Sequence, residues 1–271
     1  MSNTKRKVAR MWWDIKDVAF VGTNISKKNG MFMSMANAVP VGSVYAIKKN
    51  LFGALSDENL VFSQKTLAQK YPDFPPILSD SAKPPTQFTL DKSNETSVEV
   101  LGSLIESSQI ADISAELSTI IKSAKKLTVK IEQWGIDYIE EGELSLFFTE
   151  KANANDARIK KILSGENYVA TRGIWIKGLS FSYDVDQETI ARVKAILETK
   201  KSELANAHIN LGFKSELELD LGIEFNEKFY PFFKFRQIRP ENKADYAMVA
   251  DASLPENDVF LEDVNFAERN S

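Results

Sequence analysis

The stretch that decides the fold covers residues 209–225 and reads INLGFKSELELDLGIEF. Its odd positions are large and apolar with the single exception of Ser215, and none of its even positions is. Only a backbone with a period of two residues places these two sets on opposite faces. The alternation therefore predicts a two-sided β-strand, and one continuous strand of this length would measure roughly 55 Å at about 3.3 Å per residue.

The segments around this stretch predict strands that alternate with helices. Residues 168–183 form a strand pattern, and residues 190–204 carry one apolar stripe at helical spacing. Residues 229–235 form an aromatic strand in which Pro231 indicates an edge or a bulge. Residues 88–134 repeat the order strand, helix, alternating strand. The fold class is therefore α+β, with a twisted, largely antiparallel sheet and surrounding helices.

Composition limits the chemistry that the chain can perform. The 271 residues are 43% apolar and carry a formal net charge of −4, which is typical of a folded globular protein. There is no cysteine and a single histidine, His208, so thiolate chemistry and any site that needs two histidines are excluded. Motifs for nucleotide binding, serine nucleophiles and zinc proteases are missing as well. We therefore expect no enzyme activity, no metal, no cofactor and no nucleic-acid partner.

The charge is unevenly distributed along the chain. Residues 1–49 carry a net charge of +7, and residues 240–271 carry a net charge of −6. Each cation near an anionic membrane contributes about 1 kcal/mol, so four cations would contribute roughly 4 kcal/mol, and tryptophans would add interfacial anchoring. The alternative is that the cations are solvated and the tryptophans belong to the core. The candidate membrane-binding residues are Lys5, Arg6, Lys7, Arg10, Trp12 and Trp13.

The acidic C-terminal part has a pattern of its own. Residues 245–254 show neither a strand period nor a helix period, and a short apolar patch returns at residues 259–266. A linker followed by a small docking peptide has this pattern, and so has a C-terminal extension packed on the core. We therefore divide the chain into a main domain, residues 1–238, and an acidic tail, residues 239–271, that is a candidate for autoinhibition.

The amphipathic strands are compatible with two environments. In a soluble protein their apolar face packs on a core that a helix partly covers. A strand that crosses a bilayer needs only about 9–11 residues, so the strands would be long enough if the helix between them unwound. Open strand edges are not tolerated in lipid, so such hairpins must close into a ring of many subunits. The candidate membrane-inserting residues are Leu179, Phe181, Tyr183, Leu217, Leu219, Leu221, Ile223 and Phe225.

In its order of elements, the chain resembles the gasdermin pore-forming family, in particular the short bacterial and fungal members. The resemblance covers most of residues 85–238. It is carried by a helix pattern around residues 110–124 and by the segments LTVKIEQW (127–134), ENYVATRGIWIKGLSFSYD (166–184), LELDLGIEF (217–225) and FYPFFKFRQI (229–238). The resemblance implies a gasdermin N-terminal-domain-like fold and an autoinhibited monomer that, once released, binds acidic lipid, oligomerises and inserts two β-hairpins per subunit.

The family resemblance also bears on the trigger. In short microbial gasdermins, a C-terminal peptide keeps the protein in its resting state until a partner protease removes it. By this resemblance, residues 240–271 would have the same role here. The chain departs from bacterial members because it lacks their lipid-modified cysteine near the N-terminus. It is similar in this respect to fungal forms, some of which respond to a different allelic partner, and this leaves the inhibitory role of the tail open.

The leading hypothesis is a pore-forming effector of cell death, cytoplasmic when inactive and located at the cell membrane when active. Its partners would be acidic membrane lipids, further copies of itself, and an activating protease or allelic partner protein. The alternative, from a different functional class, is a soluble α+β binding or scaffold protein whose amphipathic strands never leave the core.

Overall fold

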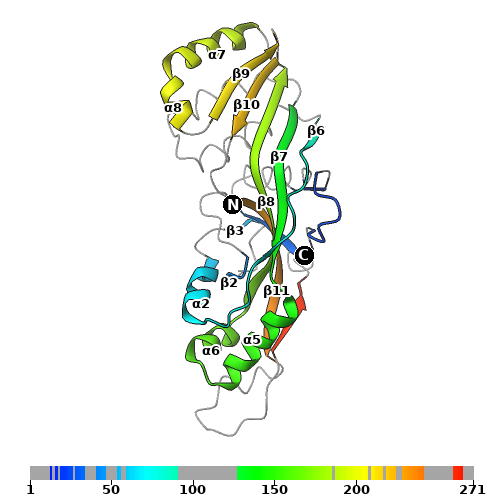
Figure 1. Ribbon diagram of the computed structural model, residues 1–271, viewed down its shortest axis with the longest axis vertical. Coiled ribbons are helices and arrows are strands. Elements are labelled where there is room, and N and C mark those ends of the chain that lie inside the picture. Colours follow the sequence, from blue (N-terminus) through cyan, green and yellow to red (C-terminus); the bar gives the residue numbers. More distant parts are fainter. Residues whose placement is uncertain are drawn as a thin grey trace.

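The computed structural model consists of one β-sheet with helices at both of its ends (Figure 1). Within the described residues twelve strands form this sheet, and all their pairs are antiparallel except that of β1 (Gly30–Met33) with β3 (Ala54–Leu55). The structure thus confirms the α+β class and the largely antiparallel sheet. The described residues are 13, 16, 17, 19–26, 28–33, 41–46, 54, 55, 59–90, 127–184, 187–206, 209–215, 218–223, 228–240 and 259–264.

The central strand, β8 (Asn167–Asp184), extends from one end of the elongated molecule to the other (Figure 1). One of its edges pairs first with β2 (Val44–Ala46) and then with β7 (Leu127–Tyr138). Its other edge pairs first with β11 (Phe229–Pro240) and then with β10 (Glu218–Ile223). Because β8 has a partner on both edges over most of its length, it connects the two ends of the fold.

At one end, which we call the hairpin end, five strands lie side by side in the order β6, β7, β8, β10, β9. The helices α7 and α8 lie beside β9 at this end (Figure 1). They bury Val193, Ile196 and Leu204, members of the apolar stripe predicted from the sequence. The bounds of the elements new here are Thr86–Leu90 for β6, Ile209–Ser215 for β9, Gln187–Thr199 for α7 and Lys201–Asn206 for α8.

At the other end, which we call the helical end, α2 (Gln64–Lys70), α5 (Glu141–Asn153) and α6 (Ala157–Ser164) pack on the sheet (Figure 1). Helix α6 begins after Asp156, whose carboxylate accepts the amide hydrogens of the first turn, as an N-cap does. The core of this end is rich in aromatic side chains. Its buried rings include Tyr45, Phe74, Phe147, Phe148, Tyr168, Phe233 and Phe235.

Three short strands complete the sheet. They are β4 (Leu60–Phe62), which pairs with β2, β5 (Leu78–Ser79), which pairs with β7, and β12 (Val259–Asp263), which pairs with β11. The pairing of β11 with β8 shifts its register between Phe229 and Phe232. Pro231 lies in this interval, so the structure confirms the bulge that the proline indicated.

The structure corrects two predictions about the hairpin end. The alternating stretch is not one strand: it forms β9 and β10, which fold back on one another as an antiparallel pair. The apolar stripe of residues 190–204 is also divided, because α7 ends at Thr199 and α8 starts at Lys201. The helix expected around residues 110–124 lies outside the described residues.

Candidate functional site

The hairpin end carries a sheet whose two faces differ completely in chemistry. Residues directly opposite one another in antiparallel strands share a face, so the register of β9, β10, β8, β7 and β6 defines rows across the sheet. Three rows are apolar or aromatic at every position except Thr86. These rows are Phe213, Leu219, Tyr183, Leu127 and Leu90; Leu211, Leu221, Phe181, Val129 and Phe88; and Ile209, Ile223, Leu179, Ile131 and Thr86.

Where the five strands lie side by side, the opposite face contains only polar residues and glycine. Two rows of register partners lie between the apolar ones. These rows are Gly212, Asp220, Ser182, Thr128 and Thr89, and Asn210, Gly222, Ser180, Lys130 and Gln87. A strand that separated water from hydrocarbon would need this alternation, and here five neighbouring strands have it in phase.

Most of the residues predicted to insert into a membrane are brought together on the apolar face. Leu179, Phe181 and Tyr183 of β8 are the register partners of Ile223, Leu221 and Leu219 of β10, in that order. The other two candidates, Leu217 and Phe225, lie outside the described residues. The sequence predicted that residues 179, 181 and 183 share one face of their strand and that the odd positions of residues 209–225 share one face of theirs, and the pairing of β8 with β10 is what the structure adds.

The hairpin keeps its two faces separate through a shift in register. Ser215 pairs with Glu218, but the next pair is Phe213 with Leu219, so Lys214 is an extra residue in β9. Regular pairing continued from Ser215 would place Phe213 opposite Asp220 and mix the two faces. The β-bulge therefore puts the odd positions of both strands on one face.

The apolar face is buried at its centre in the described structure. Val129 and Ile131 of β7 are 1% and 0% exposed, respectively. Leu211 and Phe213, on the outer strand β9, are half-buried. Burial of an aliphatic side chain contributes about 1.5–3 kcal/mol, so this face stabilises the folded chain as long as other parts of the protein cover it.

The candidate membrane-binding residues at the N-terminus divide into two groups. Lys5, Arg6, Lys7, Arg10 and Trp12 lie outside the described residues. Trp13 is 5% exposed, and its ring lies 5.2 Å from that of Phe232, centroid to centroid. In this state Trp13 is thus part of the core, and contact with a membrane would require it to leave Phe232.

A buried carboxylate, which the sequence analysis missed, fastens β7 to its neighbours. Asp137 accepts hydrogen bonds from the ammonium group of Lys228 at 2.8 and 2.9 Å, from Ser79 at 2.7 Å and from the hydroxyl of Tyr230. Burial, together with the bond to Asp137, raises the pKa of Tyr230 above its ordinary value. The ammonium group of Lys228 also lies 4.7 Å from the ring centroid of Trp175. The network joins β5, β7 and β8 to the start of β11.

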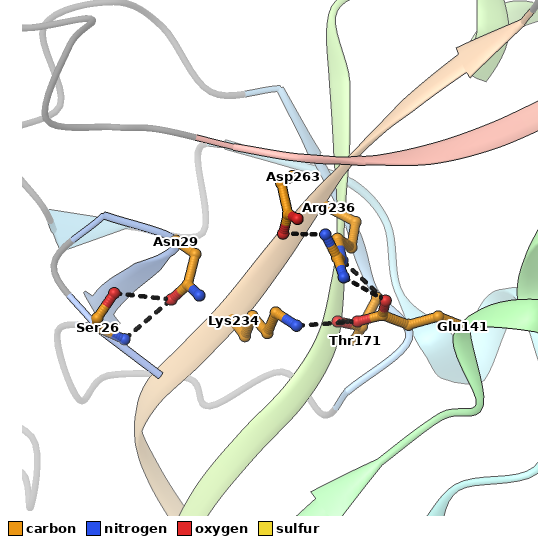
Figure 2. A network of polar contacts seen from close by, with 7 residues as sticks. All are labelled: Ser26, Asn29, Glu141, Thr171, Lys234, Arg236 and Asp263. Carbon is orange, nitrogen blue, oxygen red and sulfur yellow. Dashed lines mark hydrogen bonds and ion pairs between the residues drawn. The ribbon is translucent and has the colours of Figure 1, made fainter. Parts of the chain in front are cut away.

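A second polar network surrounds Glu141 at the start of α5 (Figure 2). Its carboxylate accepts hydrogen bonds from Arg236 at 2.8 Å, from Thr171 at 3.1 Å and from Lys234 at 3.3 Å. Burial alone would raise the pKa of Glu141, but the hydrogen bond from Arg236 and the charge of Lys234 outweigh burial and hold the pKa below its usual value. Arg236 pairs in addition with Asp263 of β12. This network thus connects α5, β11 and the C-terminal strand.

The tail contributes the strand β12 to the helical end. Residues 236–240 of β11 pair with it, and Arg239 forms an ion pair with Glu262 at 3.1 Å. Val259 and Val264 are buried in the core cluster, whereas Phe260 is 49% exposed. Part of the apolar patch predicted at residues 259–266 therefore packs on the core, and the division of the chain at residue 238 stays a prediction.

Neither a metal site nor a membrane-spanning helix is found among the residues that the structure describes. Among those residues, no group of three or more histidine, cysteine or acidic side chains is arranged to hold a metal ion. None of the helices described there combines the length and the apolar character needed to cross a bilayer.

The chain has a structural likeness to known proteins, although its sequence matches none of the families or curated proteins compared with it. Among solved structures, the chain is similar to a bacterial gasdermin from Bradyrhizobium tropiciagri, with a TM-score of 0.47 and 10% sequence identity, over 87% of this chain and 89% of that chain.

Proposed function

We propose that this chain is a membrane pore-forming effector of cell death, held inactive as a monomer until cleavage or contact with a partner protein allows the tail to leave the body at an acidic membrane. The observation that carries the proposal is the hairpin end, where three apolar rows and two polar rows alternate in register over five strands. The sequence resemblance to gasdermins supports the same function. The described conformation would be the resting state.

Insertion requires longer strands than the resting state has. The seven residues of β9 span only about 23 Å at roughly 3.3 Å per residue, and the hydrocarbon core is about 30 Å thick. The segment that includes α7 and α8 lies between β8 and β9 and could supply the missing residues by becoming extended. Unfolding these helices would also remove Val193, Ile196 and Leu204 from their buried positions.

Lipid would also require the strands to find new partners. In the five-strand part of the described sheet, β6 and β9 are the outer strands. An unpaired strand edge is costly in hydrocarbon because water cannot satisfy its amide and carbonyl groups. The inserted form would therefore be a homo-oligomer in which β9 of one copy meets β6 of the next.

The charge distribution would direct the molecule to its target. The basic N-terminal segment, with Lys5, Arg6, Lys7 and Arg10, favours acidic lipids. A single copy would bind such a membrane only weakly, and assembly into an oligomer would strengthen the binding because many copies bind at once. We place the resting protein in the cytoplasm and the active oligomer at the cell membrane. Release would come from a protease that cuts between the main domain and residue 259, or from contact with an allelic partner protein.

Dye release from lipid vesicles tests the proposal. A protease recognition sequence placed within residues 241–258 allows the full-length chain to be cut on demand. We expect cut protein, and not uncut protein, to release dye from vesicles that contain phosphatidylserine, with much less release from vesicles of phosphatidylcholine alone. If neither cutting nor a candidate partner protein produces leakage, the chain is instead a soluble binding or scaffold protein.

A further inference from the structure

The strand β12 occupies a groove between β11 and α5, where it is held along one edge and, at Val259, on the other. On one edge it pairs with residues 236–240 of β11. On the other edge, the amide of Val259 donates a hydrogen bond to the hydroxyl of Thr149 at 2.9 Å, and its carbonyl accepts one from the hydroxyl of Ser145. Ser145 and Thr149 are four residues apart and so lie on one face of α5. The helix thus offers the strand a donor and an acceptor, as a neighbouring strand would.

Side chains of the groove select the sequence of the strand. Val259 and Val264 fill positions in the core cluster, where they are 1% and 5% exposed. The acidic pair between them meets two arginines: Glu262 pairs with Arg239, and Asp263 pairs with Arg236. Arg236 is itself oriented by Glu141 (Figure 2). An extended peptide with a valine at each end and two carboxylates before the second valine fits this groove.

The covalent connection between β11 and β12 is much longer than the pairing of the two strands requires. Pro240 and Val259 are register partners, yet 18 residues, 241–258, separate them in the sequence. A hairpin between two such strands needs only about 2–5 residues. Fully extended, a segment of this length could reach about 60 Å, at roughly 3.3 Å per residue, so a strand from another molecule could reach the groove.

We propose that the groove between β11 and α5 is a strand-acceptor site that holds residues 259–264 without covalent connection and can exchange them for the same segment of a second copy. This is strand addition at a sheet edge, with specificity from pockets and charge. The site does not depend on pore formation, because neither a membrane nor the hairpin end takes part in it.

Cut full-length protein tests the proposal in the absence of lipid. After cleavage within residues 241–258, we expect the C-terminal fragment to stay with the body in gel filtration at physiological salt. A fluorescent peptide of residues 256–268 should replace the fragment in the cut protein. The same peptide should bind the uncut chain far less, because there the tethered strand, residues 259–264, competes at a high effective concentration. Separation of fragment and body in gel filtration would overturn the proposal, whether or not the body stays folded.

Two peptide variants make the test specific, and both leave the protein itself unchanged. Val259→Asp places a carboxylate in the buried position and should weaken binding more than about tenfold. Phe260→Asp, one residue away, changes an exposed side chain and should bind within about threefold of the original peptide. Equal affinity of the two variants would show that the groove does not recognise this strand and would also overturn the proposal.

Discussion

Glu141 shows how one carboxylate can fix the position of three elements. It lies between Lys234, whose side chain is 7% exposed, and Arg236, which continues to the tail. Because its pKa is lowered in the folded state, its contribution to stability is present above the unfolded pKa of about 4.3 and is lost as the pH falls through the folded value. The junction of α5, β11 and β12 should therefore weaken in acid.

Replacement of this carboxylate tests that account. Glu141→Gln should lower the free energy of unfolding at neutral pH by about 1–3 kcal/mol, because a buried ammonium group loses its charged partner. It should also reduce the loss of stability between pH 5 and pH 3, a range set by that unfolded pKa of about 4.3. Urea unfolding across this range measures both effects. Glu143→Gln, an exposed position on the same helix, is the control and should change neither.

Gly135 marks a close approach between β7 and β8. A Cβ atom at this position would lie 2.5 Å from Cζ2 of Trp175, its register partner. Gly135→Ala should therefore destabilise the fold by about 1–3 kcal/mol through overpacking. Gly142→Ala, in α5, meets nothing within 4 Å and should instead stabilise the protein by about 0.5–1 kcal/mol. Thermal unfolding of the two variants distinguishes them, and equal melting temperatures would contradict the close contact.

At the scale of elements, a charge introduced on one face of β9 should have a different effect on pore activity from a charge introduced on the other face. Leu211→Asp places a charge on the apolar face, where its cost in hydrocarbon is repeated in every copy of the oligomer. It should abolish dye release while vesicle binding persists. Asn210→Asp introduces the same carboxylate on the polar face and should leave dye release within about twofold of the original. If both variants leak equally, this face does not enter lipid.

The strands of the hairpin end were accessible from sequence because each keeps its own period of two. The turn between β9 and β10 was not accessible, because the bulge at Lys214 leaves the odd positions apolar on both sides of it. A single strand and this hairpin therefore share one sequence pattern. Proline was more informative: Pro231 has no amide hydrogen and fixes its backbone, so it indicated a bulge at the correct place.

The polar networks could not be predicted because their members are distant in sequence. Asp137 and Tyr230 are 93 residues apart, and so are Glu141 and Lys234. Each of these residues alone has the pattern of an ordinary polar position in a strand or helix. Only the pairing of β11 with β8, and of β8 with β7, brings them together.

At the scale of the whole molecule, the two ends should respond differently to a membrane. The chain has no cysteine, so single cysteines at Leu211 and at Leu146 can each carry an environment-sensitive dye. Leu211 belongs to the hairpin end, and Leu146, 58% exposed, belongs to α5 at the helical end. On acidic vesicles, the dye of cut Leu211→Cys protein should shift to the blue, and that of Leu146→Cys should not. A shift of equal size at both positions would contradict insertion by one end.

The extra residue in β9 has a consequence for how the length of this chain can vary over generations. Deletion of Lys214 would leave Ser215 opposite Glu218 and Phe213 opposite Leu219, now in uninterrupted succession. Deletion of Gly212 would reverse the parity of the residues before it and move leucine and isoleucine to the side of Asp220. Within the described part of this hairpin, the loss of Lys214 at the bulge would thus preserve the fold, whereas the loss of a regularly paired residue of β9 would disrupt it.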